Sequence, residues 1–295
     1  MGTFQFGIDL RRLYSAIVRF RRTLPSLALV FALPFLSACG GEQFVAGAGT
    51  PEAGAPDAGG PFCPTQSGTD FSCSDFDEKP LPENWNALLT KPGSVAVAED
   101  DAASVSPPNS LLAMAPALGP GAAATESFVS ATALPAGGVH IALDVRIDAL
   151  SFPNNATGAA VVPLLYTQRN YEVLLAFVPS TTGPFDFFLV ELAPGPVTAL
   201  DAGSTSTPHD LTALFAQPDD AGPSLGSWQH LELALNIDKG DKSATVTVGS
   251  RSIVVSLNPP VGTANGNRTF SIGVQATPPT GPTKIRFDNV TYSAN

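Results

Sequence analysis

Strict alternation between apolar and polar residues is the feature that most constrains how this chain folds. In residues 139–148, VHIALDVRID, every second side chain is apolar. Residues 228–238, WQHLELALNID, repeat the pattern, with leucines on one face and Trp228, His230 and Glu232 on the other. Because successive side chains of a strand point to opposite faces, both segments are predicted to be strands with one buried and one solvated face.

The same signal recurs through the C-terminal part of the chain. Residues 243–248 and 251–257 read as two strands joined through Gly249, a hairpin. Further strand-like segments are AAVVPLLYTQ, YEVLLAFV, FDFFLVEL, TFSIGVQA and KIRFDNVTYS. DLTALFAQ is the one candidate for a short helix, and no repeat of 20–50 residues suggests a propeller or solenoid. Residues 62–295 are therefore predicted to form one all-β, two-sheet antiparallel sandwich.

Residues 1–38 have the layout of a secretory signal. Five arginines precede an uncharged apolar run, residues 24–38, which ends in small side chains. A transmembrane helix is the alternative, but such a helix needs about 20 apolar residues. Pro25 and Pro34 interrupt this shorter run, so a cleaved signal is favoured.

The end of that run, LSAC at residues 36–39, resembles the lipobox of bacterial lipoproteins. The resemblance implies that Cys39 carries a diacylglycerol group and becomes the new N-terminus, with the lipid bilayer as its partner. Gly40 after the cysteine implies an outer-membrane location, either periplasmic or surface-facing. The alternative is an ordinary signal cut after Ala38, which leaves a free thiol.

A tether and a disulfide are expected next along the chain. Residues 39–61 are rich in Gly, Ala and Pro and have too little apolar surface to offset the entropy of ordering. Cys63 and Cys73 enclose a short polar segment, and export makes their oxidation to a disulfide the expectation. A zinc site would need more Cys or His nearby than the sequence has.

The charge of the chain excludes one class of partner. The full chain has 15 Lys+Arg and 26 Asp+Glu; without residues 1–38 the counts are 10 and 25, a net charge of −15. Nucleic-acid affinity is built from Lys and Arg that neutralise phosphates, so nucleic acid is excluded.

Two stretches and the chain end resemble the concanavalin A-like, or laminin-G-like, jelly-roll family. They are GSWQHLELALNIDKGDKSATVTVGSRSIVVSL, FSCSDFDEKPLPENWNALL and the final IRFDNVTYS. The resemblance implies a jelly-roll sandwich, but this fold hosts lectins, glycanases and adhesive modules alike. It also implies a structural Ca²⁺ ion held by Asp77 or Glu78 together with Asp288. The alternative is that Asp77 and Asp288 cap turns.

The sequence offers no catalytic motif. The Glu-x-Asp-x-x-Glu pattern of β-glucan hydrolases is missing, as are HExxH, Gly-x-Ser-x-Gly and a phosphate loop. The nearest match, LDVRID, places Arg146 between Asp144 and Asp148, which favours ionised carboxylates in surface ion pairs over a general acid.

The strand face with Trp228, His230 and Glu232 is the candidate ligand-binding surface, because an aromatic ring can stack on a sugar while polar neighbours hold its hydroxyls. Packing of Trp228 in the core is the alternative. The first expectation is thus a membrane-anchored lipoprotein with a non-catalytic domain that binds glycan or a surface protein. The alternatives are a glycan-processing enzyme, either hydrolase or lyase, and a purely structural envelope protein.

Overall fold

The computed structural model describes most of the C-terminal three-quarters of the chain. The described residues are 62–63, 71–77, 85–91, 94–99, 104–132, 138–154, 156–181, 183–193, 205–215, 225–238, 240–263 and 268–294. Residues 1–61, which include Cys39 and the predicted signal and tether, lie outside these ranges. Within the described ranges no helix has the length and apolar character needed to cross a bilayer.

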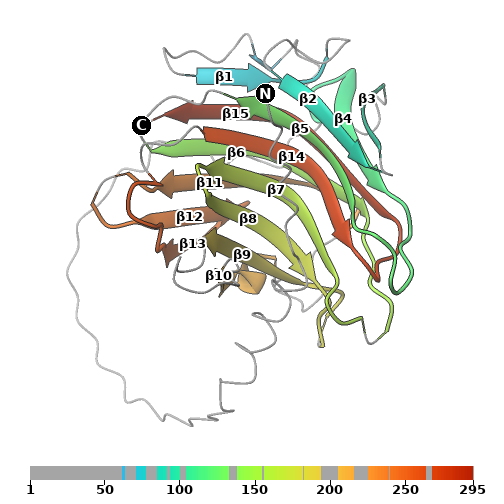
Figure 1. Cartoon of the computed structure of the whole chain (residues 1–295). Coiled ribbons are helices and arrows are strands. Elements are labelled where there is room, and N and C mark those ends of the chain that lie inside the picture. The colour runs from blue at the N-terminus through green and yellow to red at the C-terminus, as the bar shows by residue number, and fades with distance from the viewer. Residues whose placement is uncertain are drawn as a thin grey trace, which may run out of the picture.

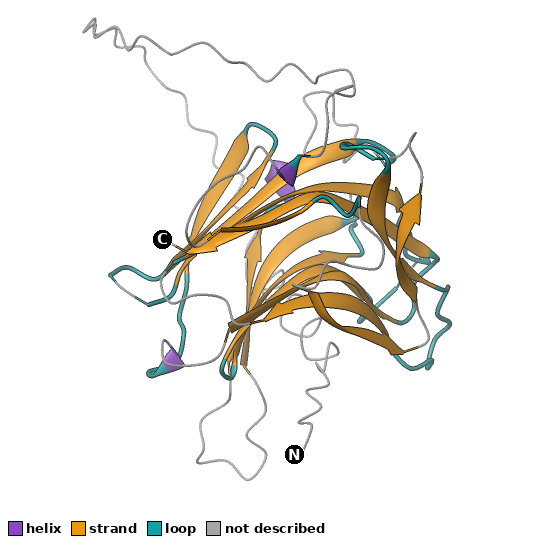
Figure 2. Ribbon diagram, turned by 90° about the horizontal axis from the view of Figure 1, so that it is seen from above, coloured by secondary structure: helices purple, strands orange, loops and turns teal. Residues whose placement is uncertain are grey.

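In the described part of the chain, fifteen strands form two antiparallel sheets, which lie one over the other as separate layers (Figures 1 and 2). Sheet A has the order β13 (Arg251–Ser256), β12 (Ser243–Val248), β11 (Trp228–Asn236), β6 (Val139–Ala149), β15 (Thr283–Ala294), β4 (Asn109–Ala115) and β3 (Ser94–Glu99), and β1 (Phe71–Ser74) also pairs with β15. Sheet B has the order β10 (Thr205–Asp210), β9 (Asp186–Ala193), β8 (Tyr171–Val178), β7 (Ala160–Gln168), β14 (Arg268–Thr277), β5 (Thr125–Thr132) and β2 (Trp85–Lys91). The predicted all-β jelly-roll sandwich is confirmed.

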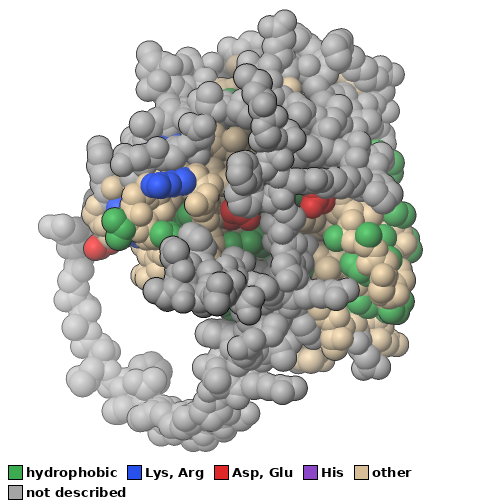
Figure 3. Space-filling model, viewed as in Figure 1, with side chains coloured by type: hydrophobic (Ala, Val, Ile, Leu, Met, Phe, Trp, Pro, Cys, Tyr) green, Lys and Arg blue, Asp and Glu red, His purple; other side chains and the backbone are tan. Residues whose placement is uncertain are grey.

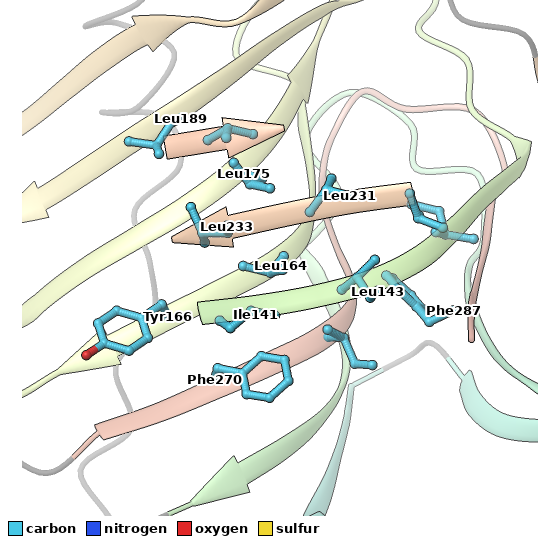
Figure 4. Packing of buried hydrophobic residues seen from close by; sticks show 14 of the residues in the cluster. Ile141, Leu143, Leu164, Tyr166, Leu175, Leu189, Leu231, Leu233, Phe270 and Phe287 are labelled. Atoms are coloured by element: carbon cyan, nitrogen blue, oxygen red, sulfur yellow. The ribbon is translucent and has the colours of Figure 1, made fainter. Parts of the chain in front are cut away.

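The core lies between the two sheets and follows from the alternation in the sequence. Ile141 and Leu143 of β6 and Leu233 of β11 face Leu164 of β7 and Phe270 of β14, and all five are buried (Figure 4). Fully burying one such side chain contributes about 1.5–3 kcal/mol. On a strand with a single apolar face, such as β6 or β11, burial of that face therefore decides which side of the strand points into the core.

Local turns also match the sequence. The predicted hairpin joins β12 and β13, and Gly249 at its turn has a φ of 58°, a left-handed conformation that glycine adopts without strain. The candidate helix is a single 3₁₀ turn, Thr212–Leu214, which buries Leu214.

The two sheets present different outer faces. The more uniformly apolar strands β7, β8 and β9, together with Phe128 of β5, form a second buried cluster on the side away from the core: Phe128, Ala160, Val162, Leu174, Ala176, Val178, Phe188, Val190 and Leu192. Few charged side chains show among the described residues on the side of the molecule seen in Figure 3. The outer face of sheet A is polar, because β6 and β11 place their polar residues there.

The start of the domain is held by a covalent bond. The predicted disulfide is confirmed: Cys63 and Cys73 are bonded, with their Cα atoms 5.5 Å apart. The Cys63 backbone N–H donates to Asp75 Oδ2, and Trp85 Nε1 donates to Ser74 Oγ at 2.7 Å. These contacts fasten the segment that enters the sandwich next to β15.

Candidate functional site

The candidate site lies where β6 pairs with β11 on the outer face of sheet A. The antiparallel register places His230 opposite Asp144 and Trp228 opposite Arg146. Residues 141 and 143 point into the core, so residues 140, 144 and 146 point outward. The register thus brings residues about 86 positions apart in sequence onto one surface.

One imidazole ring spans two carboxylates at this place. His230 Nδ1 donates to Asp144 Oδ1 at 2.9 Å, and its Nε2 lies 3.3 Å from Glu232 Oε1. The other Glu232 oxygen lies 3.3 Å from His140 Nε2. The four side chains form a continuous histidine–carboxylate row, comprising His140, Glu232, His230 and Asp144.

The row is accessible to solvent at one end and anchored at the other. The exposed fraction of the side chain is 47% for His230 and 39% for Glu232, but only 16% for Asp144. Asp144 accepts a further hydrogen bond from Asn289 Nδ2 at 2.9 Å. Asp144 is therefore the fixed member, while His230 and Glu232 face the solution.

The electrostatics of the row favour a protonated ring. The hydrogen bond to Asp144 raises the pKa of His230 above its ordinary value; burial opposes the rise, and the charges of Asp144 and Glu232 add to it. A carboxylate only accepts hydrogen bonds, so a ring between two carboxylates is fully satisfied only when both nitrogens carry protons. The ring of His230 is therefore a proton donor whose pKa lies above the ordinary value for histidine.

The neighbouring acid, Asp148, serves a different purpose. Arg286 Nε donates to Asp148 Oδ2 at 2.8 Å, and Lys284 Nζ lies 3.5 Å from the same oxygen. Arg146 Nε lies 2.7 Å from the other oxygen, Oδ1. Burial acts to raise the pKa of Asp148, but the hydrogen bond from Arg286 and the three positive charges outweigh burial and lower it. The expectation that Asp148 sits in surface ion pairs, not as a general acid, matches this geometry.

Of the three residues predicted to bind a ligand, Trp228, His230 and Glu232 do share one face. Trp228 is half-buried and lies outside the core clusters, while Trp85 supplies the buried indole of the core. Sequence reasoning missed that Asp144, His140 and Asn289 belong with them. The alternating pattern placed Asp144 and His140 on an outer face, but nothing local to the sequence indicated their partners.

Of the acids expected to hold calcium, Asp288 binds the segment before β4, and Asp77 binds the first residue of β4. Asp288 Oδ2 accepts from the backbone N–H groups of Val105 and Ser106 at 2.7 and 3.0 Å. Asp77 Oδ1 accepts from the Asn109 N–H at 3.2 Å. Both side chains thus make the turn-capping contacts that were the alternative to metal binding. Burial raises the pKa of Asp288 to about 7 despite its hydrogen bonds.

Calcium remains a prediction for this end of the molecule. Glu78 lies outside the described residues. Among the residues that are described, no group of three or more His, Cys, Asp or Glu side chains is arranged to hold a metal ion.

A second titratable group lies inside the sandwich. Glu191 of β9 accepts hydrogen bonds from Tyr171, from His209 at 2.7 Å and from the Asn258 backbone N–H at 2.7 Å. Its side chain is only 3% exposed and Tyr171 is fully buried. Because these groups bond to one another across β8, β9 and β10, we assign them to the stability of the fold.

Comparison with known proteins found distant structural neighbours but no sequence relative. No protein family's sequence profile matches the chain, and no curated protein sequence matches it. Among solved structures, an endo-beta-1,4-glucuronan lyase from the fungus Trichoderma reesei is 11% identical, with a TM-score of 0.49 over 72% of this chain and 92% of that one. An alginate lyase from Chlorella virus is 11% identical, with a TM-score of 0.46 over 72% and 93%.

A third solved structure, an endo-1,3-beta-glucanase from Streptomyces sioyaensis, is 13% identical, with a TM-score of 0.43 over 78% of this chain and 99% of that one. At such identities the likeness concerns the sandwich fold. The names of these neighbours, two lyases and a glucanase, run against the first expectation of a non-catalytic recognition domain and are nearer to its alternative, a glycan-processing enzyme. At identities of 11–13% and TM-scores below 0.5 they assign no activity to this chain.

Proposed function

We propose that this protein cleaves glycan chains by general acid–base chemistry on the outer face of sheet A. The single observation that carries the proposal is the accessible His230 ring held between the carboxylates of Asp144 and Glu232. Cleaving a glycosidic bond needs a group that protonates the leaving oxygen and a second group that activates the attacking water. The row supplies one group for each purpose.

His230 is the proposed general acid. Its raised pKa extends the pH range over which the ring stays protonated, as a general acid requires. The proton to be given is on Nε2, because Nδ1 is held by Asp144. The Nε2 contact with Glu232 is long, at 3.3 Å, so an entering glycosidic oxygen can replace it at little cost.

Glu232 is the proposed general base. Its side chain is 39% exposed, so the carboxylate can accept a proton from a water molecule on the solvent side of the row. Trp228 stands two residues before His230 on the same face of β11 and offers an aromatic surface for a sugar ring.

A neutral glycan is the favoured substrate class. The chain has a formal net charge of −11, which repels a polyuronate. In addition, the cations of this face, Arg146, Arg286 and Lys284, are already paired with Asp148. Hydrolysis is therefore preferred over elimination, which would need a cation to neutralise a substrate carboxylate.

The test is incubation of the full chain with a panel of neutral and acidic polysaccharides, with new reducing ends and unsaturated ends measured separately. The native chain should release reducing ends from a neutral glycan. His230→Ala and Glu232→Gln should each lower kcat by about 10²-fold or more. Val254→Ala, on the same face and 68% exposed, is the matched control and should retain activity. Full activity in both site variants would refute the assignment.

A further inference from the structure

The β15 strand interrupts its pairing with β6 beside the histidine–carboxylate row. Asp288 pairs with Asp144, but the next paired residue is Thr291, opposite Ala142. Asn289 lies in the interruption and has a φ of 49°, in the left-handed region that Asn tolerates better than most residues. Such a backbone is retained only where the surrounding contacts determine it.

The side chain of Asn289 is buried and bonded at both ends. Its Nδ2 donates to Asp144 Oδ2 at 2.9 Å, and its Oδ1 accepts from Ser106 Oγ at 2.7 Å. Its backbone N–H donates to Asp288 Oδ1 at 2.8 Å. Because Ser106 occupies the amide oxygen, the amide nitrogen is the end that faces Asp144.

We propose that Asn289 is a positioning residue, which fixes the Asp144 carboxylate so that Asp144 in turn orients the His230 ring. This inference rests on the function proposed above. Asn289 occupies one carboxylate oxygen and leaves the other for His230 Nδ1. The ring is then turned so that Nε2 faces Glu232 and the solution.

Other side chains would not serve this position. An aspartate would set a second carboxylate against Asp144, and a leucine would leave Asp144 Oδ2 without its donor. Two charged groups contact His230: Asp144 on the neighbouring strand β6 and Glu232 on the same strand, β11. His140 of β6 contacts Glu232. Asp288 of β15 stands opposite Asp144 in the register and binds the Val105–Ser106 backbone.

The experiment is a proton NMR titration of His230 in the full chain, in native form and as Asn289→Gly. Glycine keeps the left-handed backbone and removes only the side chain. We expect the pKa of His230 to fall toward the ordinary 6.5 in the variant, since a freed carboxylate holds the ring less well. Asn236→Ala is the matched control, because that amide bonds to the Asp241 carbonyl beyond the opposite end of β11. The control should leave the titration unchanged.

Ser106→Ala is a second variant that tests the same inference if Asn289→Gly does not fold. It removes the contact that fixes the Asn289 amide and leaves the interrupted strand pairing in place, so a smaller fall in the pKa of His230 is expected. A pKa equal to the native value in Asn289→Gly, or in Ser106→Ala if the first does not fold, overturns the inference.

Kinetics separate this inference from the proposed function. On the glycan that the native chain cleaves, Asn289→Gly should lower kcat by about tenfold, part of the 10²–10⁴-fold that general acid–base catalysis contributes, with KM unchanged. If the native chain cleaves no glycan, the proposed function fails. The His230 titration still decides whether Asn289 orients the row.

Discussion

Glu191 of β9 and His209 of the edge strand β10 are joined at 2.7 Å between Oε1 and Nε2, inside the sandwich. The contact joins β10, the edge strand of sheet B, to a side chain on the core-facing side of β9. The Glu191 carboxylate also accepts from Tyr171 and from the Asn258 N–H, so it links β8, β9 and the segment after β13. A charged group in this position makes the fold sensitive to acid.

Acid should weaken the fold through Glu191. Burial acts to raise its pKa, but the hydrogen bonds from His209, Asn258 and Tyr171 outweigh burial and lower it. The folded pKa therefore lies below the unfolded value of about 4.3, so this stabilisation is present above pH 4.3 and is lost as pH falls through the folded pKa. Urea unfolding at several pH values measures the loss.

Glu191→Gln should lower the free energy of unfolding at neutral pH by about 2–4 kcal/mol, because buried donors lose their charged acceptor. The difference from the native chain should shrink as pH falls through the folded pKa of Glu191, because the native carboxyl then becomes protonated. Glu232→Gln, a change of the same kind at a half-exposed site, is the control and should alter stability little. A loss that stays equal from neutral pH to the acid end of the native transition would contradict the assigned charge state.

Activity should decline on the alkaline side through His230. The hydrogen bond and charge of Asp144 raise the pKa of His230, so the acid form persists below the folded pKa and disappears as pH rises through it. In a plot of log kcat against pH, the alkaline limb should have its midpoint above 6.5. Asp144→Asn should move that midpoint down, since the charge that raises the pKa is removed. A midpoint that stays in place would exclude His230 as the acid.

Replacing each of the two tryptophans by alanine should affect different properties of the protein. Trp85 is buried in the core against Phe76 and Phe270, with ring centroids 5.8 and 5.4 Å away. Trp85→Ala should lower the free energy of unfolding by about 3–5 kcal/mol. Trp228→Ala should cost much less stability and should raise KM for glycan. Equal destabilisation in thermal melts would show that Trp228 packs as core instead.

Calcium binding is tested by thermal melting with added Ca²⁺ or with chelator. If Asp77 and Asp288 hold the ion, Ca²⁺ should raise Tm, because a ligand that binds only the folded state stabilises it. Asp77→Asn should abolish that rise. An unchanged Tm in the native chain would leave Asp288 as a cap of the segment before β4 and Asp77 as a partner of the first residue of β4.

Anchoring through Cys39 is tested by the mass of the mature N-terminus. A lipid-modified cysteine should give a fragment that begins at residue 39 and is heavier by its acyl chains. Cys39→Ser should release the domain from membranes in a fractionation experiment, because several acyl chains are what make such anchoring durable. A native N-terminus without added mass would indicate an ordinary signal cut.

Local patterns were enough to predict the sandwich, the hairpin at Gly249, the Cys63–Cys73 disulfide and the shared face of Trp228, His230 and Glu232. Each depends on residues near one another along the chain. An alternating segment has one apolar face whichever strand it pairs with, and burial of that face selects the side.

Only the tertiary structure shows which residues of other strands lie beside these solvent-facing side chains. Residue 230 lies opposite Asp144 because β6 and β11 pair in one register, and Asn289 reaches Asp144 because the pairing of β15 with β6 is interrupted there. Register between distant strands is set by how the whole core closes, which no local segment encodes. The sequence therefore determined what each strand presents to solvent, and the packing of the two sheets decided which groups meet.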